Sequence, residues 1–523
     1  MYPSTTLSQV LIYLTIAVFF SIGVWAGLRK KQSKDTWLTA RNTQGWLSLG
    51  TNFFAAGLGV WTVFAIPEVG TGLGLIGTVD YAIACILPLF ALCYMGPLLR
   101  RKAPNGVTIT QFVHTRFGWA AQLVTNLTTL FYMGIYLISE LTALAFLLET
   151  YGIDPLWPQI VVCSATIIYT SIGGMPASLI TDKFQGWIVM LLMIIAVVAI
   201  STTIRLPSNF DAIPRLIPPT TEGWQSLYTL PIAVTAANMF HQGYWQRVYS
   251  ARSNRDLYLG VAFASSILFP VMLAFGIGGM VAVWSGLSEK NNSIAFFNIM
   301  EVLPSWANGF VLVLAVALVA SSTDTLQSGL AATITTDIFM NKLSLIWARV
   351  GAALINIPAV VLALRGYSVL QLFLIADLIA AVVVVPVILG LVTRLNGTLN
   401  GFDFVVSVVG GFVSVVGFGW VFEGSFEYGI KLLGLPNGLS KSGESIGAFV
   451  AAPLGALVFM FLSSFIRRPI MKAMGWNTVG YQEPVAQHDE LTTAVNSEER
   501  PADVENKTAI VANNTQSHAG PSH

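Results

Sequence analysis

Residues 311–339 read VLVLAVALVASSTDTLQSGLAATITTDIF, and this is the most informative stretch of the chain. Its first part is apolar enough to form a membrane-spanning helix. The sequence then becomes polar at a depth that corresponds to the middle of the hydrocarbon core. The polar run consists of Ser321, Ser322, Thr323, Asp324 and Thr325. Because ionisable groups are costly inside a membrane, those that occur there usually serve a function.

One face of this helix is lined with oxygen atoms. Leu318, Ser321, Ser322 and Thr325 recur at i, i+3, i+4 and i+7, so they share a helical face that offers a carbonyl and hydroxyl groups. Uncharged oxygen ligands suit a small hard cation that must be held weakly enough to be released. The alternative is a Ser/Thr-rich helix that packs closely against its neighbours.

The composition defines an all-α polytopic membrane protein. The chain has 523 residues, 54% of them hydrophobic and 10% charged, with a mean hydropathy of +0.69. These values exclude a soluble enzyme. Lys and Arg number 27 against 26 Asp and Glu, so the charge favours neither a nucleic-acid partner nor an acidic substrate. No phosphate-binding loop, HExxH or Cys/His cluster occurs, so we expect neither an enzyme nor a bound cofactor.

At about 20 apolar residues per membrane-spanning helix, the sequence predicts about 13 spans. They lie near residues 7–28, 45–66, 73–99, 120–149, 156–174, 179–203, 227–246, 257–284, 308–337, 344–364, 368–392, 403–421 and 447–467. Basic clusters follow the odd-numbered spans, which predicts an outside N-terminus and a cytoplasmic C-terminus. We expect the lipid bilayer around these spans to be the plasma membrane.

The second predicted span is interrupted. It reads SLGTNFFAAGLGVWTVFAIP and contains Gly50, Gly57, Gly59 and Pro67, a high density of residues that weaken a helix. Such an interruption frees backbone groups to bind a cation or a solute. The alternative is a glycine-faced packing helix.

The seventh predicted span also lacks lipid character, since Asn238, His241, Gln242, Trp245 and Arg247 crowd its end. If the second and seventh spans are equivalent, spans 2–6 and 7–11 form two five-helix repeats in opposite orientation, because five is odd.

These features predict five segments along the chain. They are a leading helix and first cytoplasmic loop (1–44), repeat one with the start of repeat two (45–246), the remainder of repeat two (247–400), two extra C-terminal helices (401–470) and a disordered cytoplasmic tail (471–523).

The two interrupted spans are predicted to frame a solute. Aromatic walls with a few hydrogen-bonding groups are typical of such sites, and the candidate residues are Trp61, Glu140, His241, Gln242 and Trp245. For Arg247 we favour an interfacial anchor at the end of its span.

Acidic residues indicate the charge of that solute. Those in or at the edge of spans are Glu68, Asp80, Glu140, Asp324 and Asp377, and no Lys or Arg is expected well inside any span. Unpaired buried acids must bind protons, cations or a cationic substrate. We expect Glu68 and Asp80 to reach water at span ends, and the solute to be a small urea-like or cationic molecule.

Several motifs occur together in order. They are Gly173-Gly174 before Thr181-Asp182 and Gln185, residues 101–105 (RKAPN) with Thr108, residues 242–247 (QGYWQR), and Ser321-Ser322 before Thr336-Asp337-Ile338. Over roughly residues 5 to 470, the chain resembles the sodium:solute symporters, and within them the fungal and plant urea and polyamine permeases. The resemblance implies a fold of two LeuT-type inverted repeats with one extra N-terminal helix.

The resemblance also implies cation ligands. Ala55 and Leu58 match the family's backbone ligands on the broken helix, and the carbonyl of Leu318 with the hydroxyls of Ser321 and Ser322 matches the rest. Asp182 with Thr325 matches a second cation position found in some members, and we place Asp324 with them in the coupling machinery.

One residue departs from the family pattern. Where some members carry an aspartate on the broken helix, this chain has Gly57, so the predicted cation site is uncharged, with Asp324 and Glu140 lying elsewhere. Sodium and a proton both fit as the coupling ion.

The function predicted from these features is cation-coupled symport that imports a small polar nitrogenous solute, urea-like or polyamine-like. The alternatives are a facilitator or channel for the same solute, a symporter for an amino acid, sugar or carboxylate, and a sensor that binds without transport.

Overall fold

The structure, a computed structural model, describes residues 2–29, 33–205, 219–290, 292–340, 342 and 344–475. Within these residues the regular secondary structure consists of helices, and one isolated bridge joins Gln44 and Ala251. The tail that the sequence predicts to be disordered falls almost entirely outside the described residues.

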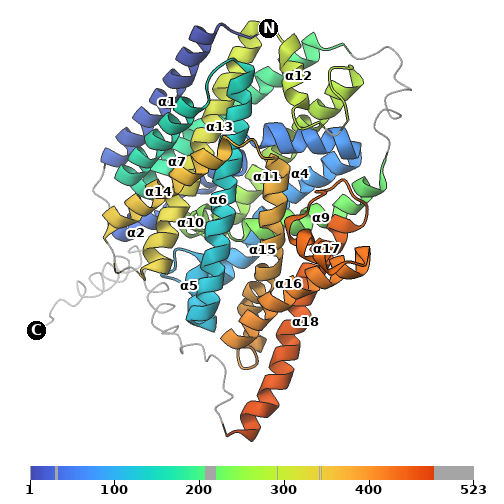
Figure 1. Cartoon of the computed structure of the whole chain (residues 1–523). Coiled ribbons are helices and arrows are strands. Elements are labelled where there is room, and N and C mark those ends of the chain that lie inside the picture. The colour runs from blue at the N-terminus through green and yellow to red at the C-terminus, as the bar shows by residue number, and fades with distance from the viewer. Residues whose placement is uncertain are drawn as a thin grey trace, which may run out of the picture.

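The long elements follow the predicted spans (Figure 1). They are α1 (Thr5–Leu28), α3 (Trp46–Gly57), α4 (Thr62–Lys102), α6 (Trp119–Thr150), α7 (Leu156–Thr203), α9 (Thr221–Asn238), α10 (Gln242–Ser250), α11 (Asn254–Trp284), α13 (Ser305–Ala332) with the π-helix η2 (Thr333–Ile338), α14 (Leu345–Ala363), α15 (Val369–Leu391), α16 (Gly401–Glu423) and α18 (Glu444–Ala473). Short helices are α2 (Lys34–Thr39), α5 (Ile109–Phe117), α12 (Ala295–Val302), α17 (Phe426–Lys431), η3 (Thr393–Leu395) and η4 (Leu432–Gly434).

Among the described residues, nine helices are long and apolar enough to cross a membrane. In two of them, α4 and α7, consecutive predicted spans meet at a glycine, although α4 contains only the last part of the second span, from Thr62 onward, before the third. Gly74 in α4 has φ 65° and ψ −152°, and Gly174 in α7 has φ 56° and ψ −150°. This region of backbone space is open almost only to glycine, so each glycine turns one span into the next. Exposed apolar side chains such as Leu191, Ile194 and Val198 cover the outer surface of α7, as expected for lipid contact.

Two spans are broken, as the sequence predicted. In the second span α3 ends at Gly57 and α4 begins at Thr62, which leaves the stretch from Leu58 to Trp61 as the first break. In the seventh span α9 ends at Asn238 and α10 begins at Gln242, which leaves Met239 to His241 as the second break.

The helices pack in pairs that repeat between the two halves of the chain. Helix α3 packs on α11 as α9 packs on α4, and α3 packs on α7 as α9 packs on α15. Helix α13 packs on α7 as α14 packs on α6. These pairings relate spans 2–6 to spans 7–11, and they place both breaks in the interior, beside α6 and α13. Helices α16 and α18 pack together outside the repeats, and α18 extends beyond the end of the bundle opposite the N-terminus (Figure 1).

The kink at Gly174 gives a prediction about stability. A Cβ at this position would lie 2.4 Å from the carbonyl oxygen of Trp37 on α2, in a backbone conformation that alanine avoids. We expect Gly174→Ala to lower the thermal stability of the detergent-solubilised protein by several degrees, since strain of this kind costs about 1–3 kcal/mol.

Gly134→Ala is the matched control, because no atom lies within 4 Å of a Cβ at that helical glycine. It should unfold at or above the parent temperature. Equal melting temperatures for both variants would contradict the role given to the Gly174 kink.

Candidate cation and solute site

The first break is closed by a carboxylate from α6. Glu140 is fully buried, and its Oε2 accepts a hydrogen bond from the backbone N–H of Val60 at 2.9 Å. A Cβ on Gly59 would lie 1.6 Å from Glu140 Oε1. The carboxylate therefore sits against the break, where only glycine leaves room for it.

The predicted cation ligands partly meet at this break. The hydroxyl of Ser322 lies 3.3 Å from the carbonyl oxygen of Leu58 and 2.9 Å from that of Leu318, and it donates toward both. Ala55 lies in the last turn of α3, whose final carbonyls lack intrahelical partners. These groups form an oxygen-lined position between α3 and α13.

One expectation about this position is wrong. The sequence placed Glu140 away from the cation ligands, whereas the structure places it at the break that carries Leu58. The sequence could not show this, because helix α6 reaches the break only through tertiary packing. A carboxyl group therefore lies beside the oxygen-lined position, although Gly57 supplies none.

Aromatic rings in mutual contact connect the two breaks, and we call this cluster of Trp61, Tyr136, Phe373, His241 and Tyr244 the aromatic chamber. Trp61 donates its indole N–H to the hydroxyl of Tyr136 at 2.9 Å, and both rings contact Phe373 with centroids 5.2 Å away. Tyr136 also lies edge-on to His241, 5.5 Å away, and His241 stacks on Tyr244 at 4.5 Å. Trp61 and His241, which the sequence assigned to one solute site, are thus joined through Tyr136.

Two other predicted solute residues make contacts within the protein. Trp245 is fully buried and donates its indole N–H to the carbonyl of Met239 at 2.7 Å, so it closes the second break. Gln242 bonds to the Thr129 hydroxyl on α6 at 3.3 Å and accepts from the Ile109 N–H on α5 at 3.4 Å. Neither side chain is in a ring or hydrogen-bond contact with Trp61 among the described residues.

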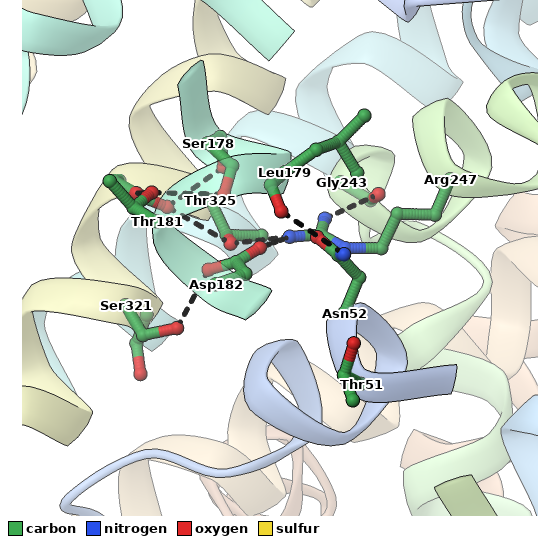
Figure 2. A network of polar contacts seen from close by, with 12 residues as sticks. Thr51, Asn52, Ser178, Leu179, Thr181, Asp182, Gly243, Arg247, Ser321 and Thr325 are labelled. Atoms are coloured by element: carbon green, nitrogen blue, oxygen red, sulfur yellow. Dashed lines mark hydrogen bonds and ion pairs between the residues drawn. The ribbon is translucent and has the colours of Figure 1, made fainter. Parts of the chain in front are cut away.

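A buried ion pair lies beside α13 (Figure 2). Asp182 on α7 and Arg247 on α10 are fully buried and form a close salt bridge. Arg247 Nη2 also donates to the Thr325 hydroxyl at 2.9 Å, and Nη1 donates to the carbonyl of Gly243 at 2.8 Å. The other carboxylate oxygen of Asp182 accepts from Ser321 at 2.8 Å.

Two expectations about these charges are therefore wrong. Arg247 is not an interfacial anchor, and spans do contain a buried basic residue. The sequence QGYWQR looked like the end of a span, but the break at Met239 to His241 makes α10 the second half of a broken helix, which is buried throughout. Asp182, which the sequence predicted not to be a surface charge, is indeed buried.

Asp324 is buried among hydroxyl donors. Its carboxylate accepts hydrogen bonds from Tyr169 at 2.6 Å, Ser178 and Thr181 at 3.0 Å and Thr325 at 3.3 Å. Thr325 thereby joins Asp324 to Arg247. The predicted unpaired acid is instead part of the polar network that holds α7, α10 and α13 together.

Three further acids lie near the aromatic chamber. Asp377 on α15 is 5% exposed and has neither a hydrogen-bonding nor a basic partner among the described residues. Asp80 on α4 is 1% exposed, so the expectation that it reaches water is wrong. Within the described ranges its oxygens accept no hydrogen bond, and the hydroxyl of nearby Ser226 donates to the Gly223 carbonyl at 2.7 Å. The hydroxyl group of Tyr81 is close enough to the carboxyl groups of Asp377 and Glu68 to interact with them electrostatically.

Glu68 lines a cavity of about 450 Å³ between α4, α15 and the loop after η4. Leu374, the neighbour of Phe373 on α15, lines the same cavity. None of its lining residues is basic. Glu68 therefore borders a cavity whose lining includes the residue next to Phe373 in the chain.

Tyr136, Phe373 and the partner of Asp182 were not predicted from the sequence. A signal for the first two was present, since Tyr136 precedes Glu140 and Phe373 precedes Asp377 by four residues, on the same helical face. In the part of the chain that the structure describes, no group of three or more His, Cys, Asp or Glu side chains could hold a metal ion.

Comparisons with known proteins agree with this architecture. The model of the sodium:solute symporter family matches residues 37–391. A spermidine transporter of Candida albicans is 33% identical over 473 residues, which cover 89% of this chain and 91% of the relative. A sodium/sialic acid symporter of Aliivibrio fischeri is 28% identical over 186 residues, 35% of each protein.

Solved structures show the same fold. The substrate-bound outward-open state of a Na⁺-coupled sialic acid symporter gives a TM-score of 0.64 at 17% identity, covering 86% of this chain and 97% of that one. The inward-facing conformation of Mhp1 gives a TM-score of 0.50 at 14% identity, with coverages of 87% and 97%.

Two broken helices in paired repeats, with polar groups gathered at the breaks, define a secondary transporter of LeuT-type fold. The chain belongs to the sodium:solute symporter family. It is an integral membrane protein that performs cation-coupled symport of a small molecule, and it is not an enzyme.

The contact between Gly59 and Glu140 predicts a position-specific loss of transport. Gly59→Ala should abolish uptake, because the new methyl group would overlap Glu140 Oε1 and lie 2.6 Å from Trp61 Cδ1. Gly57→Ala should retain uptake, since its Cβ would make only ordinary 3.4 Å contacts with Leu268 and Tyr244.

The measurement is solute uptake normalised to the amount of protein at the cell surface. Loss of uptake in both variants would show general sensitivity of the break, and normal uptake in Gly59→Ala would show that Glu140 does not occupy the described position.

Proposed function

We propose that the protein imports a polyamine-like organic cation across the plasma membrane, driven by sodium that binds at the first break. The N-terminus would lie outside and the C-terminus in the cytoplasm. The observation that carries the proposal is a set of buried carboxylates without basic partners beside an aromatic chamber. The similarity to a spermidine transporter supports the same class of solute.

The cation site would consist of Ala55, Leu58, Leu318, Ser321 and Ser322. Three of these residues already meet, because the Ser322 hydroxyl contacts the carbonyls of Leu58 and Leu318. Neutral oxygen ligands suit sodium. Glu140, beside the break, would supply a negative charge when the ion is bound. Without that charge, the positive ion would be uncompensated in a region of low dielectric constant.

The solute site would be the aromatic chamber. Trp61, Tyr136 and Phe373 form a cluster of rings in mutual contact. Protonated amines are attracted to aromatic faces by about 0.5–2 kcal/mol each. Asp377 and Asp80 would each neutralise an ammonium group, which removes the cost of leaving these carboxylates unpaired. Glu68 in the cavity above would attract cations from the outer solution.

Urea, the other solute expected from the sequence, is favoured less. Neutral urea needs hydrogen-bond partners, which Tyr136 and Trp61 could supply, but it cannot compensate the charges of Asp377 and Asp80. We therefore propose that a diamine or longer polyamine is preferred.

The proposed cation site predicts different effects of the two serines. Ser322→Ala removes the hydroxyl between Leu58 and Leu318, so the sodium concentration for half-maximal uptake should rise about 10-fold, which corresponds to about 1.4 kcal/mol. Ser321→Ala should have a smaller effect on sodium, because that hydroxyl is bonded to Asp182.

Uptake is measured in cells at fixed membrane potential, with sodium varied at constant pH and then pH varied without sodium. Unchanged sodium dependence in Ser322→Ala would contradict the site, and uptake that follows pH alone would identify the proton as the coupling ion.

The proposed solute site predicts a charge-selective defect. Asp377→Asn should raise the KM for labelled spermidine by roughly 10- to 100-fold, the range expected for a charge-assisted contact of about 1.5–3 kcal/mol. Uptake of labelled urea, if present, should change less than twofold.

Glu427→Gln is the matched control, because this acid is exposed on α17 and pairs with Lys431. Unlabelled carboxylates, amino acids and sugars serve as competitors. If one of them displaces spermidine, or if Asp377→Asn carries spermidine as well as the parent does, the proposed solute class is wrong.

A further inference from the structure

The cavity beside Glu68 is large enough for a small solute and is lined by other residues than the aromatic chamber. Its volume of about 450 Å³ falls within the roughly 300–1,000 Å³ of typical ligand pockets, and none of the five chamber residues lines it. We propose that this cavity is a second binding site for the amine solute, in which Glu68 binds one ammonium group and the loop at residues 436–440 binds another. The inference rests on the proposed function, because it concerns the same class of solute.

Glu68 gives the cavity its charge. Among the described residues that line the cavity, Glu68 alone is charged. Its Oε2 is buried and accepts no hydrogen bond from any described group. A buried carboxylate without a partner is unfavourable, and a cation bound beside it relieves that penalty. The ligand of this cavity should therefore carry a positive charge, which excludes carboxylates and disfavours neutral sugars.

The rest of the lining suits an aliphatic amine better than a metal ion. Leu73 and Leu374 supply apolar wall, whereas Gln371 and Asn437 supply side-chain amides. A diamine has the same alternation, with methylene groups between two ammonium groups. A metal cation instead needs several oxygen ligands around one point, and Glu68 is the single carboxylate among the described lining residues.

The loop that forms one wall is held in place before any ligand binds. The amide nitrogen of Asn437 donates to Oε2 of Glu444 at 2.7 Å, and the hydroxyl of Tyr428 donates to the same oxygen. Glu444 is fully buried. At the end of the loop, the side-chain oxygen of Gln225 on α9 accepts from the Gly443 N–H at 2.8 Å. Because its amide nitrogen is engaged, Asn437 keeps its amide oxygen for an ammonium group, and little ordering is needed on binding.

The cavity combines two parts of the fold and is open to solution. Glu68 and Gln371 belong to α4 and α15 of the two repeats, whereas the loop joins η4 to α18, outside the repeats. Gln371 and Asn437 are exposed, so an amine can enter from solution. The C-terminal helices thereby contact the solute although they belong to neither repeat. Because the cavity and the aromatic chamber share no lining residue, both can be occupied at once.

The test is equilibrium binding of labelled putrescine to the purified full-length protein in detergent. Putrescine is a short diamine, which keeps one molecule from occupying both sites. The parent protein should bind two molecules at saturation, and Glu68→Gln should bind one. A parent that binds one molecule, or a folded Glu68→Gln protein that still binds two, would overturn the proposal.

A second variant covers the case in which Glu68→Gln does not fold. Gln371→Glu adds a carboxylate at an exposed position of the same lining, so the fold is spared. The Kd of the Glu68 cavity for putrescine should fall roughly 10-fold, because a second charge-assisted contact becomes available. The Kd for butylamine, which has one ammonium group, should fall less. Unchanged affinity for putrescine in Gln371→Glu would contradict the proposed site.

Two further variants show where a failure lies. Glu427→Gln removes an exposed acid that is outside the cavity lining and pairs with Lys431, so it should still bind two molecules. A loss equal to that of Glu68→Gln would show a general charge effect and overturn the proposal. Asp377→Asn should lose only the molecule in the aromatic chamber. If Asp377→Asn binds two molecules and Glu68→Gln binds one, the Glu68 site stands and the proposed role of Asp377 is wrong.

Discussion

The need to satisfy backbone groups freed inside the membrane governs this structure. A broken helix exposes N–H and carbonyl groups where no bulk water can bind them, so each must find a partner in the protein. At the first break Val60 N–H binds Glu140 and the Leu58 carbonyl binds Ser322. At the second, the Met239 carbonyl binds Trp245. The side chains that close the first break therefore come from α6 and α13, and the side chain that closes the second comes from α10.

Helix α13 connects the two breaks mechanically. Ser322 faces the first break, and Thr325, three residues later, contacts Arg247 beyond the second. A small rotation of α13 would alter both contacts together. The same helix carries Asp324, whose hydroxyl donors come from α7, so the polar run links the cation position to the ion pair through adjacent turns of one helix.

The sequence predicted the helices and the breaks but not the pairing of charges. Hydropathy and helix-weakening glycines are local properties of the chain. The spans and the interruption at Gly57 and Gly59 can therefore be predicted from the sequence alone. The partner of Asp182 was not, because residues 182 and 247 belong to different repeats and meet only through tertiary packing. Glu140 was judged remote from the cation ligands for the same reason. The roles of individual site residues stay predictions, whereas the fold and the family are confirmed.

The contact between Gly59 and Glu140 also constrains how this site can change during evolution. The carboxylate occupies the space that any side chain at position 59 would need, and the Val60 N–H depends on that carboxylate. A larger residue at position 59 is thus tolerable only together with a shorter one at position 140, and the shorter residue would leave the backbone N–H unsatisfied. Positions 59 and 140 therefore form an epistatic pair. A substitution at either position alone gives a defective protein, so the site can diverge only when both residues change together.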